Sequence, residues 1–315
     1  MALFTFCDLF AGIGGLRLAF EEFDGKCVFS SEIDKFARQT YEANFKDCPN
    51  GDIRKIDKES IPNHTILLAG FPCQPFSLAG LSKRNSLGRA HGFSDDEKGT
   101  LFFEIAKILA LKKPRAFLLE NVPYLKKHDG GKTFKKIIEV LTEELGYSVY
   151  SKVINSRIRV PQNRRRLYIV GFDENYGFTF PDIENQFPKL KDILESEVDP
   201  KYTISDKLWK YLRDYSEKHQ RKGNGFGYNL ADLNGIARTL SARYYKDGAE
   251  ILIPQKKNEN PRRLTPRECA LLMGFPHKYK IVVSDTQAYK QFGNTVVVPI
   301  VKEIARNMVQ CLEKN

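Results

Sequence analysis

The stretch Asp8-Leu-Phe-Ala-Gly-Ile-Gly-Gly-Leu16 decides the fold of this chain of 315 residues. It joins the apolar run Leu3–Phe10, which is typical of a buried strand, to Leu16–Phe23, whose apolar spacing is helical. Glycines in such a turn let the backbone adopt positive φ and approach a ligand closely. Because their order differs from GxGxxG, a dinucleotide pyrophosphate fits this turn poorly.

Strands and helices continue to alternate up to Phe172. Further strands are expected at Lys26–Ser31, Thr65–Gly70, Arg115–Leu119, Tyr147–Ile154 and Arg166–Phe172. Further helices are expected at Lys35–Asn44, Leu101–Leu111 and Thr133–Leu145. This alternation predicts an α/β fold, a parallel sheet with helices on both faces. Ligands of such sheets bind at the carboxyl ends of the strands, so chemistry is expected there.

Composition and charge exclude several classes of protein. Hydrophobic residues make up 42% and charged residues 28%, which excludes a disordered, collagen-like or disulfide-stapled chain. No run approaches the ~20 apolar residues of a membrane span, and the first ten residues lack the pattern of a signal peptide. The six cysteines lack zinc-ligand spacing. We therefore expect a cytoplasmic protein with no membrane contact and no metal.

The net charge of +11 is unevenly distributed along the chain. Asp8–Glu59 holds 8 basic and 11 acidic residues, whereas Tyr147–Phe172 holds six basic residues and no acid. Lys201–Thr265 holds 14 basic and 7 acidic residues. Clustered positive charge of this kind favours a polyanionic partner, although basic proteins without such a partner are common.

The regular pattern ends near Phe172 and returns at Leu271. The last segment, Val296–Leu312, is expected to turn at Pro299 into a helix. These changes predict a first domain over residues 1–180, which would hold the site, and a smaller basic domain over 181–275. Residues 276–315 would form a hinge and a segment that returns to the first domain.

Four motifs follow strands or open them. Glu32 and then Asp52 come after the second strand, and a carboxylate there suits ribose hydroxyls, so a nucleoside-bearing cofactor is expected. Cys73 lies in Gly70-Phe-Pro-Cys-Gln-Pro-Phe-Ser77, where two prolines fix the direction of the thiol. A buried structural cysteine is the alternative, and a polar loop at a strand end makes it weaker.

Glu120, in Glu120-Asn-Val-Pro123, ends another strand. Its carboxyl group would protonate or hydrogen-bond a ring nitrogen, although a helix cap is the simpler explanation of Glu120 alone. In Gln162-Asn-Arg-Arg-Arg166, Arg164 and Arg166 share a face if the strand begins there, and would bind an anion or a base edge. A solvated basic run is the alternative.

Together these motifs resemble the DNA (cytosine-5) methyltransferase family, in its bacterial restriction-modification form. The resemblance extends to Gly99–Ile105 (GTLFFEI), Arg262–Pro276 (RRLTPRECALLMGFP) and Gly293–Val301 (GNTVVVPIV), so it spans nearly the whole chain. It implies a Rossmann-like S-adenosylmethionine-dependent sheet with a smaller DNA target-recognition domain. It also implies sequence-specific methylation of cytosine carbon 5 in duplex DNA, which would protect host DNA from a cognate restriction enzyme.

The resemblance assigns roles to the catalytic residues. Cys73 would add to carbon 6 of a base flipped out of the duplex, and Glu120 would favour protonation of ring nitrogen 3. Arg166 would contact the base near its carbonyl oxygen, and Arg164 would support the site. Product S-adenosylhomocysteine would then leave. No metal takes part.

The resemblance also implies binding residues. The cofactor residues are expected to be Phe10, Ala11, Gly12, Ile13, Gly14, Gly15, Leu16, Glu32, Ile33, Asp52, Ile53, Gly70, Pro72, Leu101, Asn294 and Val296, with Glu32 on the ribose and Asp52 on the adenine amine. The DNA-binding residues are expected to be Gln74, Ser77, Arg84, Arg89, Arg221, Thr239, Arg243 and Tyr244. Thr239 and Leu240 match a Thr-Leu pair of the family.

Arg243 is the first choice and Arg221 the second as a reader of guanine, although phosphate contact is an equal alternative for either. Lys222–Tyr228 and Arg238–Ile253 resemble recognition segments of enzymes whose sites contain a CC dinucleotide. Three other functions are weighed: a tRNA cytosine-5 methyltransferase, a non-catalytic DNA-binding relative, and a nucleotide-dependent oxidoreductase. The large basic region argues against the tRNA enzyme, and the presence of both Cys73 and Glu120 argues against a non-catalytic relative. The proline-cysteine loop has no purpose in an oxidoreductase. A monomer is expected.

Overall fold

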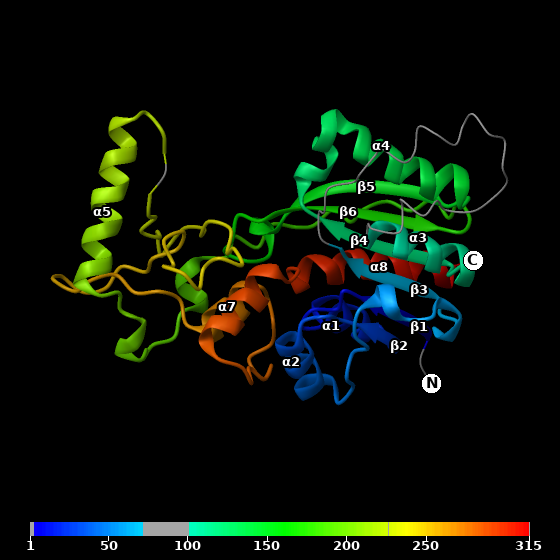
Figure 1. The fold of residues 1–315 in the computed structure, drawn as a ribbon, viewed down its shortest axis with the longest axis horizontal. Coiled ribbons are helices and arrows are strands. Elements are labelled where there is room, and N and C mark those ends of the chain that lie inside the picture. The colour runs from blue at the N-terminus through cyan, green and yellow to red at the C-terminus, as the bar shows by residue number, and fades with distance from the viewer. Residues whose placement is uncertain (1–2, 72–100, 226, 315) are drawn as a thin grey trace.

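A computed structural model describes residues 3–71, 101–225 and 227–314 of the chain. Its centre is a six-stranded sheet in the order β2-β1-β3-β4-β6-β5 (Figure 1). The strands are β1 (Phe4–Leu9), β2 (Gly25–Ser31), β3 (Ile66–Gly70), β4 (Ala116–Asn121), β5 (Ser148–Asn155) and β6 (Arg165–Phe172). All six strands expected from the sequence are present, with ends that shift by one or two residues.

The sheet is mixed rather than wholly parallel. β2, β1, β3 and β4 run parallel to one another, whereas β6 is antiparallel to both β4 and β5. The expectation of a parallel sheet is therefore wrong at β6. Only residues 156–164 separate β5 from β6, and a parallel crossover needs a dozen or more residues. The chain must turn back, and β6 enters the sheet between β4 and β5.

Helices cover both faces of the sheet. The helices are α1 (Gly15–Glu21), α2 (Lys35–Phe45), α3 (Leu101–Lys112), α4 (Lys132–Glu139), α5 (Asp206–Arg221), α6 (Pro266–Leu272), α7 (Asp285–Asn294) and α8 (Val298–Glu313). Apolar side chains of α1, α2 and α8 pack on one face, and those of α3 and α4 on the other. The two clusters take alternate residues of the strands, as the pleat requires.

Short helical turns connect these elements. They are Ile53–Lys55, Lys58–Ser60, Pro123–Lys126, His128–Gly131, Ser156–Ile158, Leu190–Ile193 and Pro200–Tyr202, with a π-helical turn at Val140–Glu144 that continues α4. The helix expected at Thr133–Leu145 is thus α4 plus this turn. Pro299 occupies the first turn of α8, where its missing N–H costs no hydrogen bond.

Residues 181–275 contain little regular structure beyond α5 and α6. α5 lies far from the sheet and packs on a small apolar cluster of Ile204, Leu212 and Leu252 (Figure 1). The chain then returns to the sheet. The Tyr279 hydroxyl donates to the carbonyl of Ile13, and α8 packs against α1.

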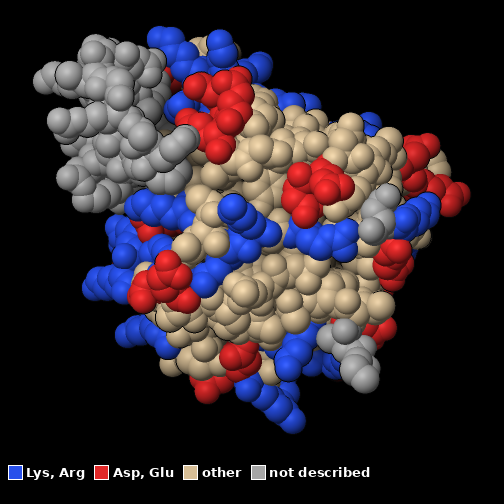
Figure 2. Space-filling view, turned by 90° about the vertical axis from the view of Figure 1, so that its right-hand side faces the viewer, with Lys and Arg blue, Asp and Glu red and all other residues tan. Residues whose placement is uncertain are grey.

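The surface turned away from α5 carries both signs of charge. Figure 2 shows Lys and Arg side chains interspersed with Asp and Glu over an otherwise uncharged surface. In the described part of the chain no helix is long and apolar enough to cross a membrane. Five cysteines of that part form no disulfide bond with one another; they are Cys7, Cys27, Cys48, Cys269 and Cys311.

Candidate functional site

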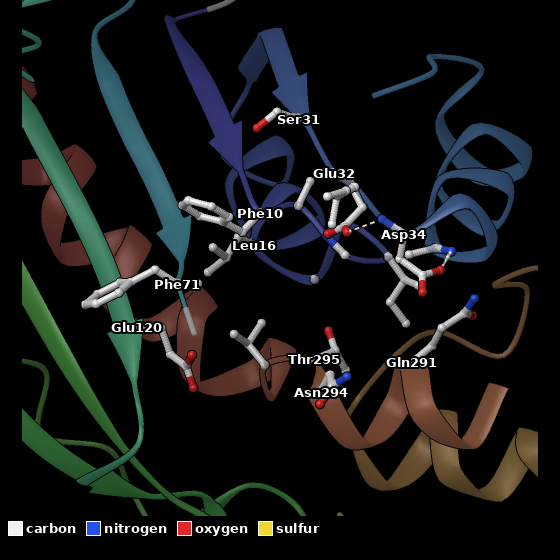
Figure 3. A pocket seen from close by; sticks show the side chains of 18 of the residues that line it. Phe10, Leu16, Ser31, Glu32, Asp34, Phe71, Glu120, Gln291, Asn294 and Thr295 are labelled. Atoms are coloured by element: carbon white, nitrogen blue, oxygen red, sulfur yellow. Dashed lines mark hydrogen bonds between the residues drawn. The ribbon is translucent and has the colours of Figure 1, made fainter. Parts of the chain in front are cut away.

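A cavity of about 540 Å³ opens at the carboxyl ends of the parallel strands (Figure 3). This volume lies in the range of small-molecule sites, about 300–1,000 Å³. The sequence-predicted residues among its lining are Phe10, Ala11, Gly12, Ile13, Gly15, Leu16, Glu32, Ile33, Asp52, Ile53, Gly70, Leu101, Glu120, Arg164, Arg166, Asn294 and Val296. The structure therefore gathers most of the expected cofactor and catalytic residues around one cavity.

The glycine-rich turn forms one wall of the cavity. Gly14 has a φ of 78°, and a Cβ there would lie 2.2 Å from Cε2 of Phe45. Gly14 does not itself line the cavity, so it serves the turn through its conformation and its lack of a side chain. Thr295 and Val296 pack closely against Gly15. A Cβ at Gly15 would lie 2.7 Å from Oγ1 of Thr295 and 2.8 Å from Cγ2 of Val296.

The Glu32 carboxylate lies next to this turn and is held there by backbone hydrogen bonds. Its Oε2 accepts a hydrogen bond from the Gly12 N–H at 2.8 Å, and its Oε1 accepts one from the Asp34 N–H at 2.8 Å (Figure 3). Two backbone donors thereby fix the carboxylate, which retains lone pairs for a ligand hydroxyl. Beside it Ile33 lines the cavity and is 65% exposed, so it offers an apolar surface to a ligand.

Asp52 lies at the rim but is engaged with Arg54. Its carboxylate binds the Arg54 guanidinium at 2.6 Å and accepts a hydrogen bond from the Arg54 N–H. These hydrogen bonds lower the pKa of Asp52. An adenine amine would have to share this carboxylate with Arg54, so the role expected for Asp52 stays a prediction. Ile53, next to it, is buried and lines the cavity.

Glu120 and Arg166 form an ion pair in the cavity wall. Nε of Arg166 lies 3.0 Å from Oε1 of Glu120, which is only 9% exposed. Burial raises the pKa of the Glu120 carboxyl group, and the charges of Arg166 and Arg164 oppose that rise only in part. The group therefore holds a proton more readily than an exposed glutamate. Gly70 lies beside Glu120 in the β3–β4 register.

Arg164 is buried at the back of the same cavity. Its guanidinium donates to the carbonyl oxygens of Leu240 at 2.8 Å, Gly293 at 3.0 Å and Thr295 at 2.8 Å. It therefore does not offer a free guanidinium to an anion. Arg164 and Arg166 both line the cavity while Arg165 between them is exposed, as the alternation of a strand requires.

The model of the family described as C-5 cytosine-specific DNA methylase matches residues 4–310. The chain belongs to this family. It is 54% identical over 322 residues to the Type II methyltransferase M1.ScrFI of Lactococcus lactis subsp. cremoris, covering 100% of this chain and 80% of that protein. It is 51% identical to the Type II methyltransferase M.NlaX of Neisseria lactamica, covering 98% of this chain and 97% of that protein. The resemblance noted in the sequence is thus confirmed.

Solved structures of methyltransferases share the fold of this cytosine methylase. The Entamoeba histolytica methyltransferase EhMeth superposes with a TM-score of 0.76 at 21% identity, covering 98% of both chains. An Escherichia coli prophage putative DNA modification methyltransferase gives 0.71 at 20% identity, covering 98% of this chain and 99% of that one. The Rossmann-like methyltransferase fold is therefore confirmed.

Residues 238–253, which the sequence suggests as a recognition segment, lie against the residues that lead into β6. The Thr239 hydroxyl donates to the Asn163 carbonyl at 2.5 Å, and a Cβ on Gly293 would lie 2.4 Å from Ser241 and Ala242. A second cavity of about 260 Å³ opens here. It is lined by Thr239, Ser241, Arg243, Lys246, Asp247 and Glu250. Arg243 is exposed and lines it, and exposed Arg221 lies apart at the end of α5, paired with Glu217.

Tyr244 does not meet the expectation of a DNA contact. It is fully buried, its hydroxyl donates to the Ile251 carbonyl at 2.7 Å, and it accepts from the Leu264 N–H at 2.8 Å. The side chain therefore supports the recognition segment from beneath. In the sequence, a tyrosine next to an arginine suggests a residue exposed to DNA. The burial of Tyr244 becomes visible only in the packed structure.

Six expected residues lie outside the described part of the chain: Pro72, Cys73, Gln74, Ser77, Arg84 and Arg89. The chain enters this segment from the cavity, because Gly70 and Phe71 both line it. The Asn121 amide donates to the Phe71 carbonyl at 2.9 Å and so ties that entry to β4.

Several residues of the site were not expected from the sequence. Asp34, Gln287, Lys290, Gln291 and Thr295 line the main cavity. Thr295 lies inside the GNTVVV motif, which was a usable signal. Gln162 opens the arginine motif and is buried, with its amide donating to the Leu272 carbonyl at 3.1 Å and accepting from the Leu240 N–H at 2.9 Å. The described residues hold no His, Cys, Asp or Glu cluster suited to a metal ion.

Gly15→Ala should lower the affinity for S-adenosylmethionine by about tenfold or more. The added methyl group would displace Thr295 and Val296 into the cavity, and overpacking of this kind costs ~1–3 kcal/mol. Isothermal titration calorimetry measures the effect. Gly51→Ala is the matched control, since Gly51 also lines the cavity and a Cβ there meets nothing within 4 Å. Equal affinities of Gly15→Ala and the wild type would contradict the assignment of this wall.

Proposed function

We propose that this protein methylates carbon 5 of a cytosine at a specific sequence in duplex DNA, using S-adenosylmethionine. The observation that carries the proposal is that the glycine turn with Glu32 and the Glu120–Arg166 pair line one cavity. The first group suits a nucleoside cofactor, and the second suits a pyrimidine edge with one acceptor and one protonated nitrogen. Membership of the C-5 cytosine-specific DNA methylase family supports both assignments.

The cavity suits S-adenosylmethionine in charge and shape. Glu32 would accept hydrogen bonds from ribose hydroxyls, and Ile33 would pack on the adenine ring. Glu32 and Asp34 line the cavity and form no ion pair with a described residue, so their carboxylates would favour a cationic sulfonium. When bound, the cofactor supplies an electrophilic methyl group. The turn over residues 10–16 and Asn294 with Val296 would hold it against β1.

The chemistry on the base would be divided between Cys73, Glu120 and Arg166. The flipped cytosine would accept the Cys73 thiolate at carbon 6, while Glu120 donates a proton to ring nitrogen 3 and Arg166 hydrogen-bonds the carbonyl oxygen. The electron pair released to carbon 5 forms the bond to the methyl group. Loss of the carbon 5 proton to solvent then expels the Cys73 thiolate, and nitrogen 3 returns its proton to Glu120.

Arg166 serves two purposes in this proposal. Its Nε keeps Glu120 oriented at 3.0 Å and its Nη1 donates to the Arg165 carbonyl at 2.8 Å, which leaves further N–H donors that would contact the base. Cys73 needs nearby positive charge to ionise at neutral pH, because a free thiol has a pKa of about 8.5. Lys83 and Arg84 follow Cys73 by ten and eleven positions in the sequence.

The biological role we propose is modification within a restriction-modification system. Relatives at 54%, 51% and 44% identity carry the names of Type II methyltransferases, which supports this role over tRNA methylation. We propose that residues 181–275 recognise the target, with Arg243 reading guanine in the major groove from the rim of the second cavity. A monomer suffices for this arrangement, since one chain supplies all of these groups.

Cys73→Ser should abolish methyl transfer while cofactor binding persists. A serine hydroxyl is too weak a nucleophile to add to carbon 6, but it leaves the described cofactor wall intact. Cells expressing the wild type should show 5-methylcytosine at one sequence by methylation-sensitive sequencing, and cells expressing Cys73→Ser should show none. Methylation by Cys73→Ser at the wild-type level would contradict the covalent mechanism.

Arg243→Ala should spread methylation over sequences related to the target.

Glu120→Gln should lower kcat by about 10²–10⁴-fold, because an amide supplies no proton to nitrogen 3. In the wild type, kcat/KM should fall as pH rises through the pKa of Glu120, since the protonated form is the active one. Burial raises that pKa, so this fall lies above the ordinary range of a glutamic acid. Radiolabelled methyl transfer across pH measures both effects. A Glu120→Gln enzyme with unchanged rate and pH profile would rule out this role.

A further inference from the structure

A strongly basic segment follows the catalytic acid and has no part in the proposed chemistry. Five lysines and one acid, Asp129, lie between Pro123 and Lys136. Lys136 is paired with Glu139 at 3.2 Å and with Glu144 at 2.9 Å. Three of the other lysines are exposed and form no ion pair with any residue that the structure describes; they are Lys127, Lys132 and Lys135. These three residues are called the lysine surface below.

The charges of α4 run against its helix dipole. Lys132 and Lys135 occupy the amino-terminal half of the helix, which has no acid in its first turn, whereas Lys136 lies in the last turn. Glu139, Glu143 and Glu144 follow at the carboxyl end. A helix carries partial positive charge at its amino end, so lysines there lower its stability. Helix stability therefore does not explain this arrangement, whereas a polyanion at the amino end would supply the missing negative charge.

The lysine surface lies close to the site of methylation in the chain and in space. Glu120 and Val122 line the main cavity, and the turn that leads to α4 begins at the next residue, Pro123. Figure 1 places the amino end of α4 on the side of the sheet that faces α5, as expected for a segment following the carboxyl end of β4. A duplex whose cytosine enters the cavity would pass this surface.

Side-chain contacts within residues 123–134 order the backbone that carries the lysine surface. The exposed Tyr124 ring packs edge-on against His128, and Nδ1 of His128 lies 2.7 Å from the hydroxyl of buried Thr133. Nζ of Lys126 lies 5.2 Å from the centre of the Phe134 ring. The lysines are thus held on an ordered base, which lowers the entropy lost when they bind.

We propose that the lysine surface binds backbone phosphates of duplex DNA beside the target cytosine. This inference rests on the proposed function, and it adds a DNA-binding face on the catalytic side to the recognition segment on the other. Lysine acts as a point charge on phosphate and reads no base, so the surface would hold the duplex in place without choosing the sequence. The sequence reasoning placed DNA contacts elsewhere and missed this segment.

The test compares two triple variants in a DNA-binding titration at several salt concentrations. One is Lys127→Gln with Lys132→Gln and Lys135→Gln. The other is the matched control, Lys26→Gln with Lys113→Gln and Lys314→Gln, three exposed lysines at the amino-terminal edge of the sheet. Fluorescence anisotropy of a labelled duplex gives the affinity. Calorimetry gives the affinity for S-adenosylmethionine and the melting temperature of each variant.

We expect the first variant to reduce the slope of log affinity against log salt by about 2.7, since each phosphate contact contributes about 0.9. Its loss of affinity between 50 and 200 mM salt should then be roughly 40-fold smaller than that of the wild type. Cofactor affinity, methyl transfer at saturating DNA and the melting temperature should not fall. The control variant should keep the wild-type slope.

Two results would overturn the inference: a wild-type slope in the first variant, or an equal loss of slope in the control. Failure of the proposed function has a different signature. In that case the wild type would bind duplex DNA with its full salt slope and transfer no labelled methyl group, whatever the lysine variants do.

Discussion

The buried guanidinium of Arg164 joins the parts of this molecule that function requires to be together. It donates to Leu240 in the segment that we propose recognises DNA, to Gly293 in the last turn of α7 and to Thr295 just after that helix. Burial, with Arg166 nearby, lowers the pKa of Arg164 to about 9, so the charge is costly to keep there. Hydrogen bonds from a charged group, each contributing about 1.5–3 kcal/mol, offset that cost. Gln162 adds a second link, because its amide bonds both Leu240 and Leu272.

This junction has consequences on both sides of the site. Thr295, held by Arg164, presses on Gly15 in the turn that forms the cofactor wall. Leu240, held by the same guanidinium, lies between Thr239 and Ser241, which both line the second cavity, so the residues before β6 help to position that cavity. Arg166, two residues further on, orients Glu120. Residues 162–166 therefore set the relative positions of three parts: the glycine-rich wall of the cavity, the Glu120 carboxyl group, and the segment that we propose recognises DNA.

Local patterns predicted much of this structure and tertiary packing decided the rest. Strand positions, the turn over residues 8–16 and the location of Glu120 at the cavity follow from periodicity and from the rule that strand ends gather ligands. The pairing of Glu120 with Arg166 was not predicted, because it depends on β6 running antiparallel to β4. The direction of β6 depends on the length of a connection rather than on its own residues. Burial of Tyr244 and capture of Asp52 by Arg54 arise from neighbours that periodicity cannot place. The lysines of α4 were visible in the sequence, but their meaning came from their position beside Glu120.

The claim that Arg164 unites cofactor binding and recognition is tested most directly by Arg164→Lys. A lysine cannot reach three carbonyls held in the plane of a guanidinium, and exposed Arg165→Lys is the control. Two quantities are measured on each protein: affinity for S-adenosylmethionine, and the ratio of methylation rates at target and non-target sequences. Both should fall together in Arg164→Lys, and neither should fall in Arg165→Lys. A variant of Arg164 that loses only one of the two, or neither, would contradict the account.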